Sequence, residues 1–251
     1  MSFAHRTPNP PLADFVELLW CYDGYAVSHA QERLLPTGTI ELVIPLSGYA
    51  AAIAGPHSQP FVIDTAEQFS IVGVHFRPGG AFPFLPMPAG ELHNLEVRLD
   101  DVWGVSATNE LRECLLAAST MDARFAILER ALLRHMRTFE RHRAVAHAIE
   151  TLKRDASVTR AMEPIGLSQR RFIDVFRNET GLTPKVFARV QRFQRLLRRI
   201  HDAQNVDWAD AALACGYFDQ SHCIRDFRAF ADLTPSEYLA RRSEHMNHVP
   251  V

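Results

Sequence analysis

The spacing of apolar positions changes about 105 residues into the chain. Before that point, apolar and β-branched residues gather in short runs at 40–46, 61–63 and 71–76, and turns rich in glycine and proline separate these runs. Runs of this length and composition are typical of β-strands. The first hundred residues therefore predict a mostly antiparallel sheet with helical additions, and a small barrel is one way of closing that sheet.

Beyond residue 105, apolar residues recur every three or four positions, as they do on one face of a helix. Two such stripes predict amphipathic helices at about 107–118 and 121–138. The second stripe can pack against the chain's own sheet, or it can pair with a second copy of the chain across a twofold axis. A homodimer is therefore one of two interpretations of this stripe.

A block of twenty residues occurs twice in the last part of the chain. Residues 168–187 match residues 219–238 at seven identical positions, where chance would give roughly one. The identical pairs are Gln169/Gln220, Ile173/Ile224, Phe176/Phe227, Arg177/Arg228, Leu182/Leu233, Thr183/Thr234 and Pro184/Pro235. A repeated block predicts a repeated supersecondary unit, and two copies are too few for a solenoid.

Each copy has the pattern of a helix-turn-helix unit, at about 157–180 and 206–231. In both units a short apolar helix precedes a glycine, and a residue that caps helices follows shortly after it. The glycines are Gly166 and Gly216, and the capping residues are Ser168 and Asp219. The equivalent phenylalanines of the repeat, Phe176 and Phe227, are predicted to face inward.

A longer helix is predicted between the two units. Thr183 suits its N-cap and Pro184 its first turn. Its apolar stripe continues for about 18 residues, which span roughly 27 Å. With a turn at each end, that length can hold two recognition helices about one DNA turn, ~34 Å, apart. The opposite face is basic, and each of its cations, such as Arg192, either contacts phosphate or stays solvated.

Composition narrows the class of protein. The chain has 251 residues, of which 47% are hydrophobic and 22% charged, as in a soluble globular protein. No apolar run approaches the ~20 residues of a membrane helix, so we expect no membrane partner. The four cysteines form no CxxC pair, which fits a reducing cytosol, and we expect a cytoplasmic protein.

The formal net charge of −2 averages two unlike halves. Residues 1–140 carry 9 Lys and Arg against 16 Asp and Glu, a net charge of −7. Residues 141–251 carry 18 against 13, a net charge of +5. A basic module joined to an acidic one favours binding of a polyanion by the basic half, although ordinary variation between domains explains the numbers equally well.

The stretches GLSQRRFIDVFRNETGLTPKVF and ACGYFDQSHCIRDFRAFADLTPSEYL resemble the DNA-binding domain of AraC/XylS transcription regulators, over about residues 142–242. The resemblance implies seven helices, with one helix of each unit in adjacent major-groove segments of double-stranded DNA. It also implies RNA polymerase as a partner. The base-facing candidates are Gln169, Arg170, Ile173 and Asp174 in the first unit, and Gln220, Ser221, His222 and Arg225 in the second. Arg177 and Arg192 are further candidates for DNA contact.

Two residues of the first unit depart from the family's pattern. Pro164 lies in the last turn of the predicted first helix and removes one backbone donor, so that helix is expected to be shortened or kinked. Asp174 stands where many relatives have a basic or amide residue. A carboxylate is repelled by phosphate but can accept a hydrogen bond from cytosine N4.

The first half resembles the N-terminal domain of a poorly characterised set of AraC-like regulators. The phrases that carry this resemblance are LLPTGTIELVIPL, IAGPHSQPFVI and VGVHFRPGGAFPFL. In the wider family such a domain senses a small molecule or dimerises. We therefore divide the chain into a regulatory domain, residues 1–140, and a DNA-binding domain, residues 141–251.

Glu41, His75 and Arg77 are the candidates for effector binding. A carboxylate on an apolar strand is costly unless it is paired, so Glu41 predicts a partner, Arg77 or Arg33, or else an edge position that faces solvent. His75 has no second histidine near it, and we expect a hydrogen-bonded structural histidine rather than a metal ligand.

The sequence thus predicts an α+β protein that binds specific DNA, with no cofactor, metal or catalytic residue. It contains no nucleophile elbow, phosphate-binding glycine loop or HExxH pattern. One alternative is a DNA repair or modifying enzyme, which would need an activated nucleophile such as Cys21. The apolar surroundings of Cys21 instead suggest an inert thiol. A second alternative is an architectural DNA binder without effector control.

Overall fold

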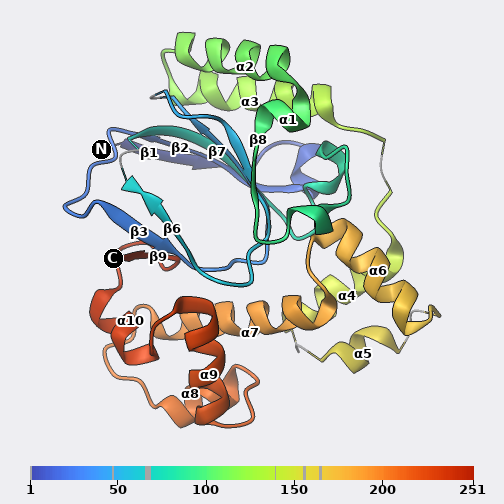
Figure 1. Cartoon of the computed structure of the whole chain (residues 1–251), viewed down its shortest axis with the longest axis vertical. Coiled ribbons are helices and arrows are strands. Elements are labelled where there is room, and N and C mark those ends of the chain that lie inside the picture. The colour runs from blue at the N-terminus through green and yellow to red at the C-terminus, as the bar shows by residue number, and fades with distance from the viewer. Residues whose placement is uncertain (1, 47, 66–68, 139, 155–156, 164–165) are drawn as a thin grey trace.

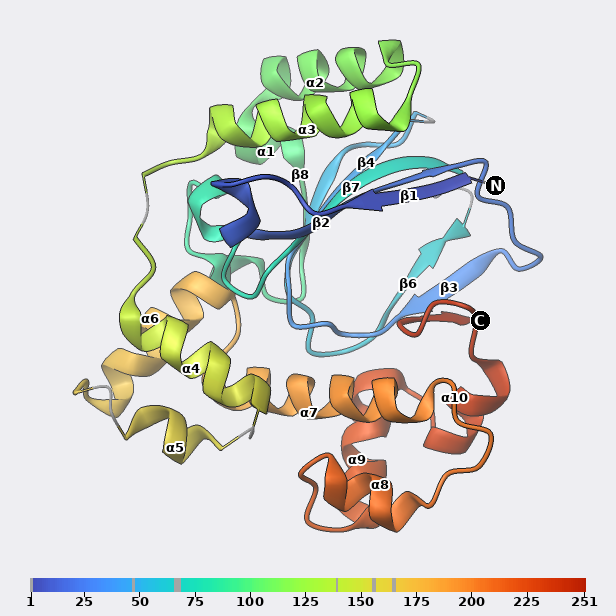
Figure 2. The ribbon, with the colours of Figure 1, turned by 180° about the vertical axis from the view of Figure 1, so that it is seen from behind.

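The computed structural model describes residues 2–251 apart from 47, 66–68, 139, 155–156 and 164–165. Figure 1 shows a β-rich N-terminal half and a helical C-terminal half, with the long helix α7 (Pro184–Ile200) along their boundary. Figure 2 shows the same arrangement from behind. The predicted fold class, an antiparallel β domain followed by a helical domain, is confirmed.

The larger sheet of the N-terminal half has six strands, and each paired neighbour is antiparallel. In spatial order they are β1 (Ser2–Arg6), β2 (Val16–Asp23), β7 (Ser70–Phe76), β4 (Glu41–Pro45), β5 (Ala52–Ala54) and β8 (Glu96–Arg98). The predicted apolar runs at 40–46 and 71–76 are the two central strands. The sheet is open, with β1 and β8 at its edges, rather than a closed barrel.

The smaller sheet contains a strand from the far end of the chain. It pairs β6 (Phe61–Asp64) with β3 (Gln31–Leu34), and β3 with β9 (His248–Pro250), both antiparallel. In the second pair, Leu34 stands opposite His248. The last residues of the C-terminal half thus complete a sheet of the N-terminal half, an arrangement that the local sequence pattern did not predict.

Helices cover one face of the larger sheet, as Figures 1 and 2 show for α2 and α3. The helical segments with described bounds in this half are η1 (Leu12–Asp14), η3 (Phe82–Phe84), η4 (Ala89–Leu92), α1 (Leu99–Trp103), α2 (Val105–Ala117) and α3 (Met121–His135). Strand residues alternate between the two faces, so Leu42 and Ile44 join the helices in one apolar core. Glu41 and Val43 face the other way.

The two helices predicted at 107–118 and 121–138 are α2 and α3, each slightly shorter or shifted. Thr120 caps α3 by accepting a hydrogen bond from the backbone N–H of Ala123. The apolar stripe of α3, Phe125, Leu128 and Leu132, is buried in the core of its own half. The stripe therefore packs against the chain's own sheet, which removes it as an argument for a dimer.

Among the described residues, the helices of the C-terminal half are α4 to α10, in agreement with the seven helices that the family resemblance implied. Their bounds are α4 (Arg143–Arg154), α5 (Val158–Met162), α6 (Gln169–Thr180), α7, α8 (Trp208–Ala214), α9 (Gln220–Ala231) and α10 (Pro235–Arg241). The predicted caps are confirmed: Ser168, Thr183 and Asp219 each accept a backbone N–H at the start of α6, α7 and α9. Pro164 lies outside the described residues.

Helix α7 separates two apolar cores. One core joins α4, α5 and α6 to the first turns of α7, and it buries Phe176 completely. The other joins the rest of α7 to α8, α9 and α10, and it buries Phe227 completely. The predicted inward orientation of these two equivalent phenylalanines is confirmed, and α7 is the shared wall of both helix-turn-helix units.

The two halves are in direct contact. The loop at 36–39 packs on α7, where Gln194 Nε2 donates a hydrogen bond to the carbonyl of Pro36 at 2.7 Å. At the end of α6, Gly181 adopts φ +84°, and a Cβ there would overlap Pro56 of the other half. No helix of the described chain is both long and apolar enough to cross a membrane.

Candidate DNA interface and effector pocket

The two candidate recognition helices, α6 and α9, pack near opposite ends of α7 (Figures 1 and 2). The 17 residues of α7 span about 26 Å. This length is close to the one that the sequence predicted between two units that read one face of a duplex.

On α6, one side of the first two turns faces solvent, whereas Phe172 and Phe176 on the other side are buried. Gln169, Arg170 and Asp174 are exposed, and Ile173 is half-buried. Arg177 is used differently, because its Nη2 donates a hydrogen bond to the carbonyl of Gly90 at 3.5 Å. A Cβ on Gly90 would lie 2.9 Å from Arg177 Cγ. Arg177 therefore contacts the N-terminal half while its side chain stays exposed, and the start of the helix is open to a partner.

On α9, Gln220, Ser221 and Arg225 are exposed. His222 is half-buried, with its Nε2 3.9 Å from the Asp226 carboxylate and its ring against Tyr217. Sequence reasoning missed Phe218, whose side chain is 85% exposed just before this helix. The sequence signal was the aromatic residue in the turn, which stands beside the capping Asp219.

Much of the basic face of α7 is bonded within the protein. Arg192 Nη1 donates to the carbonyl of Gly216 at 3.1 Å, and its guanidinium lies 4.9 Å from the centre of the Tyr217 ring. Its Nη2 is 3.6 Å from the Asp226 carboxylate, and its side chain is 15% exposed. Arg192 is thus turned inward, which the expectation of a phosphate contact did not foresee.

Asp226 explains why these arginines turn inward. It is 4% exposed, and Arg189 donates two hydrogen bonds to its Oδ1, at 3.1 and 2.7 Å. A buried carboxylate needs cations or donors around it. The matching position of the first unit is Val175, so the repeat alignment gave no sign that α9 is held to α7 by charge.

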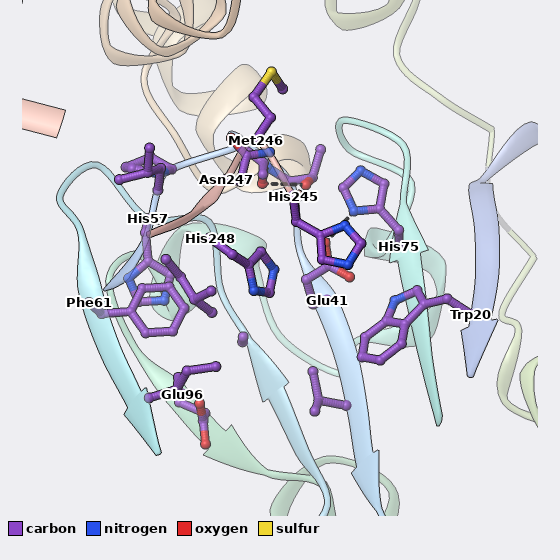
Figure 3. Close-up of a pocket in the computed structure, with 18 of the residues that line it drawn as sticks. Trp20, Glu41, His57, Phe61, His75, Glu96, His245, Met246, Asn247 and His248 are labelled. Carbon is purple, nitrogen blue, oxygen red and sulfur yellow. Dashed lines mark hydrogen bonds and ion pairs between the residues drawn. The ribbon is translucent and has the colours of Figure 1, made fainter. Parts of the chain in front are cut away.

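A pocket of about 520 Å³ lies between the two sheets and the C-terminal tail, residues 244–248. One wall is the face of the larger sheet turned away from α2 and α3, and it carries Trp20, Glu41 and His75. Figure 3 shows these three side chains on one side of the view, with His57 and Phe61 stacked on the other. The volume is in the range of small-molecule sites.

Glu41 and His75 form a hydrogen-bonded ion pair inside this pocket, between Glu41 Oε1 and His75 Nδ1. The predicted partners are wrong: Arg77 Nε donates to the carbonyl of Ala13, and Arg33 lies near Asp232. The reason is register, because β4 pairs with β7 so that Glu41 stands opposite His75. Glu41 is on a central strand, not at the expected edge.

The electrostatics of the pocket keep His75 charged. Burial alone would lower the pKa of His75, but the charge and hydrogen bond of Glu41, together with Glu17, raise it to about 9. His57, in contrast, is neutral, because burial and the neighbouring His93 lower its pKa to about 4. His75 is therefore an imidazolium that already has carboxylate partners.

Two buried polar atoms at the pocket have no hydrogen-bond partner among the described residues. They are Oε2 of Glu41 and Nε2 of His57. Native proteins satisfy most such atoms, and an unsatisfied one at a cavity indicates where a ligand or water can bond. Of the three predicted effector residues, the structure brings Glu41 and His75 to the pocket, whereas Arg77 is not among the residues that line it.

The C-terminal tail is bonded to both halves. On one side, His248 Nδ1 lies 2.7 Å from Oε2 of the buried Glu32. The other oxygen of Glu32, Oε1, accepts a hydrogen bond from Tyr25 at 2.7 Å. On the other side, Tyr238 of α10 donates to the carbonyl of Met246 at 2.9 Å. Burial would raise the pKa of Glu32, but hydrogen bonds from His248, Tyr25 and His29 lower it to about 2.

The cysteine considered for the enzyme alternative is buried. Burial raises the pKa of the Cys21 thiol, although the hydrogen bond and charge of Arg124 oppose this. A raised pKa leaves the sulfur as a thiol, which is a poor nucleophile. Across the part of the chain that the structure describes, no cluster of His, Cys, Asp and Glu has the arrangement of a metal site.

Two family models match this sequence. Residues 162–241 match a family described as a helix-turn-helix domain, and residues 4–98 match one described as a domain of unknown function, DUF6597. The search of curated proteins gives no match.

Among solved structures, several of ToxT from Vibrio cholerae are similar. One has 8% sequence identity, covers 95% of this chain and 97% of ToxT, and has a TM-score of 0.44. A structure of ToxT bound to (E)-4-(8-methylnaphthalen-1-yl)but-3-enoic acid has the same values. Unsaturated fatty acid bound ToxT has 10% identity, coverage of 88% and 90%, and a TM-score of 0.38.

Proposed function

We propose that this chain is a DNA-binding transcription regulator, because residues 162–241 match a helix-turn-helix family. In this proposal α6 and α9 read adjacent major-groove segments of one operator, under the control of a small molecule in the central pocket. The proposal that both helices read DNA rests on one observation. The first turns of α6 and α9 carry exposed polar residues, and both helices pack on α7. Because one chain presents both helices, a monomer suffices for binding, and a dimer is not required.

The exposure of the candidate residues and their hydrogen bonds within the protein favour two different roles. Gln169 and Arg170 on α6, and Gln220, Ser221 and Arg225 on α9, are the base-reading residues of the proposal, with Asp174 accepting from cytosine. Arg177 and Arg192 are positioning residues, because both are bonded within the protein. The exposed cations Lys185 and Arg198 of α7 remain for phosphate contact.

The pocket is proposed to control DNA binding through the C-terminal tail. The tail lines the pocket, pairs with β3 and is bonded to α7 and α10. A ligand that moves the tail therefore acts on the core that supports α9. We propose that the regulatory domain is residues 1–140 and that the DNA-binding domain is residues 141–251. Strand β9 belongs to the second domain by sequence and pairs with β3 of the first. RNA polymerase is the proposed partner on the promoter.

The test of DNA reading uses Arg225→Ala, with Arg130→Ala on the exposed surface of α3 as the matched control. Arg225 suits a two-bond contact to guanine, so its loss should cost about 1–3 kcal/mol on the specific site and relax the choice of base at one position. Binding of the wild type should weaken steeply with salt, because phosphate contacts release counterions. The measurement is fluorescence anisotropy on the chain's own upstream DNA and on random duplex.

The control should bind both DNAs like the wild type. Equal specificity profiles for wild type and Arg225→Ala would refute the base contact. Binding that does not respond to salt, or no preference for any genomic fragment, would refute sequence-specific DNA binding itself.

A further inference from the structure

The side chains that line the central pocket are unevenly charged. Four glutamates line it, Glu17, Glu41, Glu96 and Glu244, but no lysine or arginine is among the described lining residues. The remaining ionisable groups are histidines and a tyrosine. Among them, His75 is held in its charged form by Glu41 and Glu17, so its charge is already balanced. The described lining therefore offers acceptors and negative charge, and it provides no lysine or arginine for an anionic ligand.

The two carboxylate oxygens of Glu41 differ in their hydrogen bonding. Its Oε1 bonds His75, whereas its Oε2 is buried without a hydrogen-bond partner among the described residues. A carboxylate accepts hydrogen bonds and cannot donate them, so only a donor satisfies this atom. An ammonium group is the strongest such donor, because both partners are then charged. His57 Nε2, across the pocket, is a second buried polar atom without a partner.

The rest of the pocket suits a flat apolar body. The indole of Trp20 lies over Gly73 of the neighbouring strand, where a Cβ would overlap the ring. His57 and Phe61 stack with their ring centres 4.1 Å apart and their planes 25° from parallel. Aromatic faces attract cations as well as other rings. Leu18, Val43 and Ile63 are further apolar residues of the lining.

From these contacts we infer that the pocket binds an organic amine: a cationic ammonium group on Glu41 Oε2, attached to a planar aromatic body that lies between Trp20 and the His57–Phe61 stack. This inference rests on the proposed effector pocket and names the chemical class of its ligand. Charge disfavours an aromatic carboxylate of the same shape, because it would face Glu41 and Glu17 with no lysine or arginine among the described lining residues.

The experiment uses the full chain and three probes with one indole body: tryptamine, tryptophol and indole-3-propionic acid. Thermal stabilisation and calorimetric titration should rank them amine, alcohol, acid, with the amine about tenfold or more tighter than the acid. Glu41→Gln should weaken tryptamine by about tenfold and remove the preference over tryptophol. Glu110→Gln on the exposed surface of α2 is the control and should bind all three probes like the wild type.

A second variant tests the pocket independently, in case Glu41→Gln does not fold. Val43→Trp fills the pocket from the same strand without changing a charge, and it should abolish binding of tryptamine while leaving a cooperative melting transition. Binding of the acid that equals or exceeds binding of the amine would overturn the inference, and so would the absence of stabilisation by tryptamine at millimolar concentration.

The failure of the proposed effector control has a separate signature. If tryptamine binds as expected but leaves DNA affinity unchanged at saturation, the ligand class stands and the coupling to DNA is refuted. If the acid binds and changes DNA affinity, effector control stands and the amine inference is refuted.

Discussion

Glu41 and His75 show how a single residue acquires its role from its neighbour across a strand pair. The cost of a carboxylate on an apolar strand correctly predicted that Glu41 needs a partner. The partner is the residue directly opposite, and the resulting pair leaves one buried carboxylate oxygen without a hydrogen-bond partner among the described residues. Asp226 is the same case on a helix, where Arg189 and Arg192 meet one buried carboxylate.

At the residue scale, the raised pKa of His75 predicts a loss of stability at alkaline pH. A histidine whose pKa is about 9 when folded and 6.5 when unfolded contributes stability that is fully present below pH 6.5 and is lost as pH rises through 9. Melting scans from pH 6 to 9.5 should show the free energy of unfolding falling by on the order of 2 kcal/mol.

The control is the double variant His75→Gln, Glu41→Gln, which removes both titrating partners and should lack this component of the pH profile. A wild-type profile that parallels the profile of the double variant between pH 6.5 and 9 would contradict the ion pair.

At the scale of elements, α9 is held by charge as well as by apolar packing. Phe227 buries its ring in the second core, and Asp226 beside it accepts two hydrogen bonds from Arg189 of α7. The first unit has Val175 at the equivalent position and relies on apolar contacts around Phe176. The two recognition helices therefore have the same local design but different attachments to α7.

This difference predicts that Asp226→Ala loosens α9. Removing one partner of a buried ion pair leaves Arg192 without a counterion, so the variant should lose about 3 kcal/mol of stability. Asp210→Ala is the matched control, because its pair with Arg199 is on the surface and should contribute about 0–1 kcal/mol. Urea unfolding measures both. Equal losses for the two variants would mean that the Asp226 cluster does not anchor α9.

At the scale of the whole molecule, the C-terminal tail joins the two halves. It adds β9 to β3, lines the pocket, and contacts α7 and α10 through Asn247 and Met246. Together with the contact of Arg177 on Gly90, this makes the position of the C-terminal half depend on the N-terminal half. Such contacts are what an effector must alter if it is to change DNA binding.

His248→Ala tests the hold of the tail. The variant removes a hydrogen bond to the charged Glu32, so the free energy that holds β9 on β3 should fall by about 1.5–3 kcal/mol. Hydrogen exchange should therefore accelerate in residues 31–34 and 248–250, with little change in α3. The control is His147→Ala on the exposed face of α4. Unchanged exchange in β3 and β9 would show that the His248–Glu32 bond does not secure the tail.

The sequence by itself determined the features that depend on neighbours in the chain. These features are the two helix-turn-helix units, their inward phenylalanines and the caps at Ser168, Thr183 and Asp219, all of which follow from contacts within a few residues. The 51-residue repeat made the pattern recognisable because it occurs in two copies. The central strands of the larger sheet followed from composition in the same way.

Only the tertiary structure decided which distant residues meet. Glu32 bonds His248 across 216 positions, and Arg177, which looked like a DNA contact, donates a hydrogen bond to Gly90 in η4, 87 positions earlier. Strand register and the docking of one half on the other set these contacts, and neither leaves a periodic signal in the sequence. The pocket is for that reason invisible in the sequence: its walls come from two sheets and a tail that only the folded chain brings together.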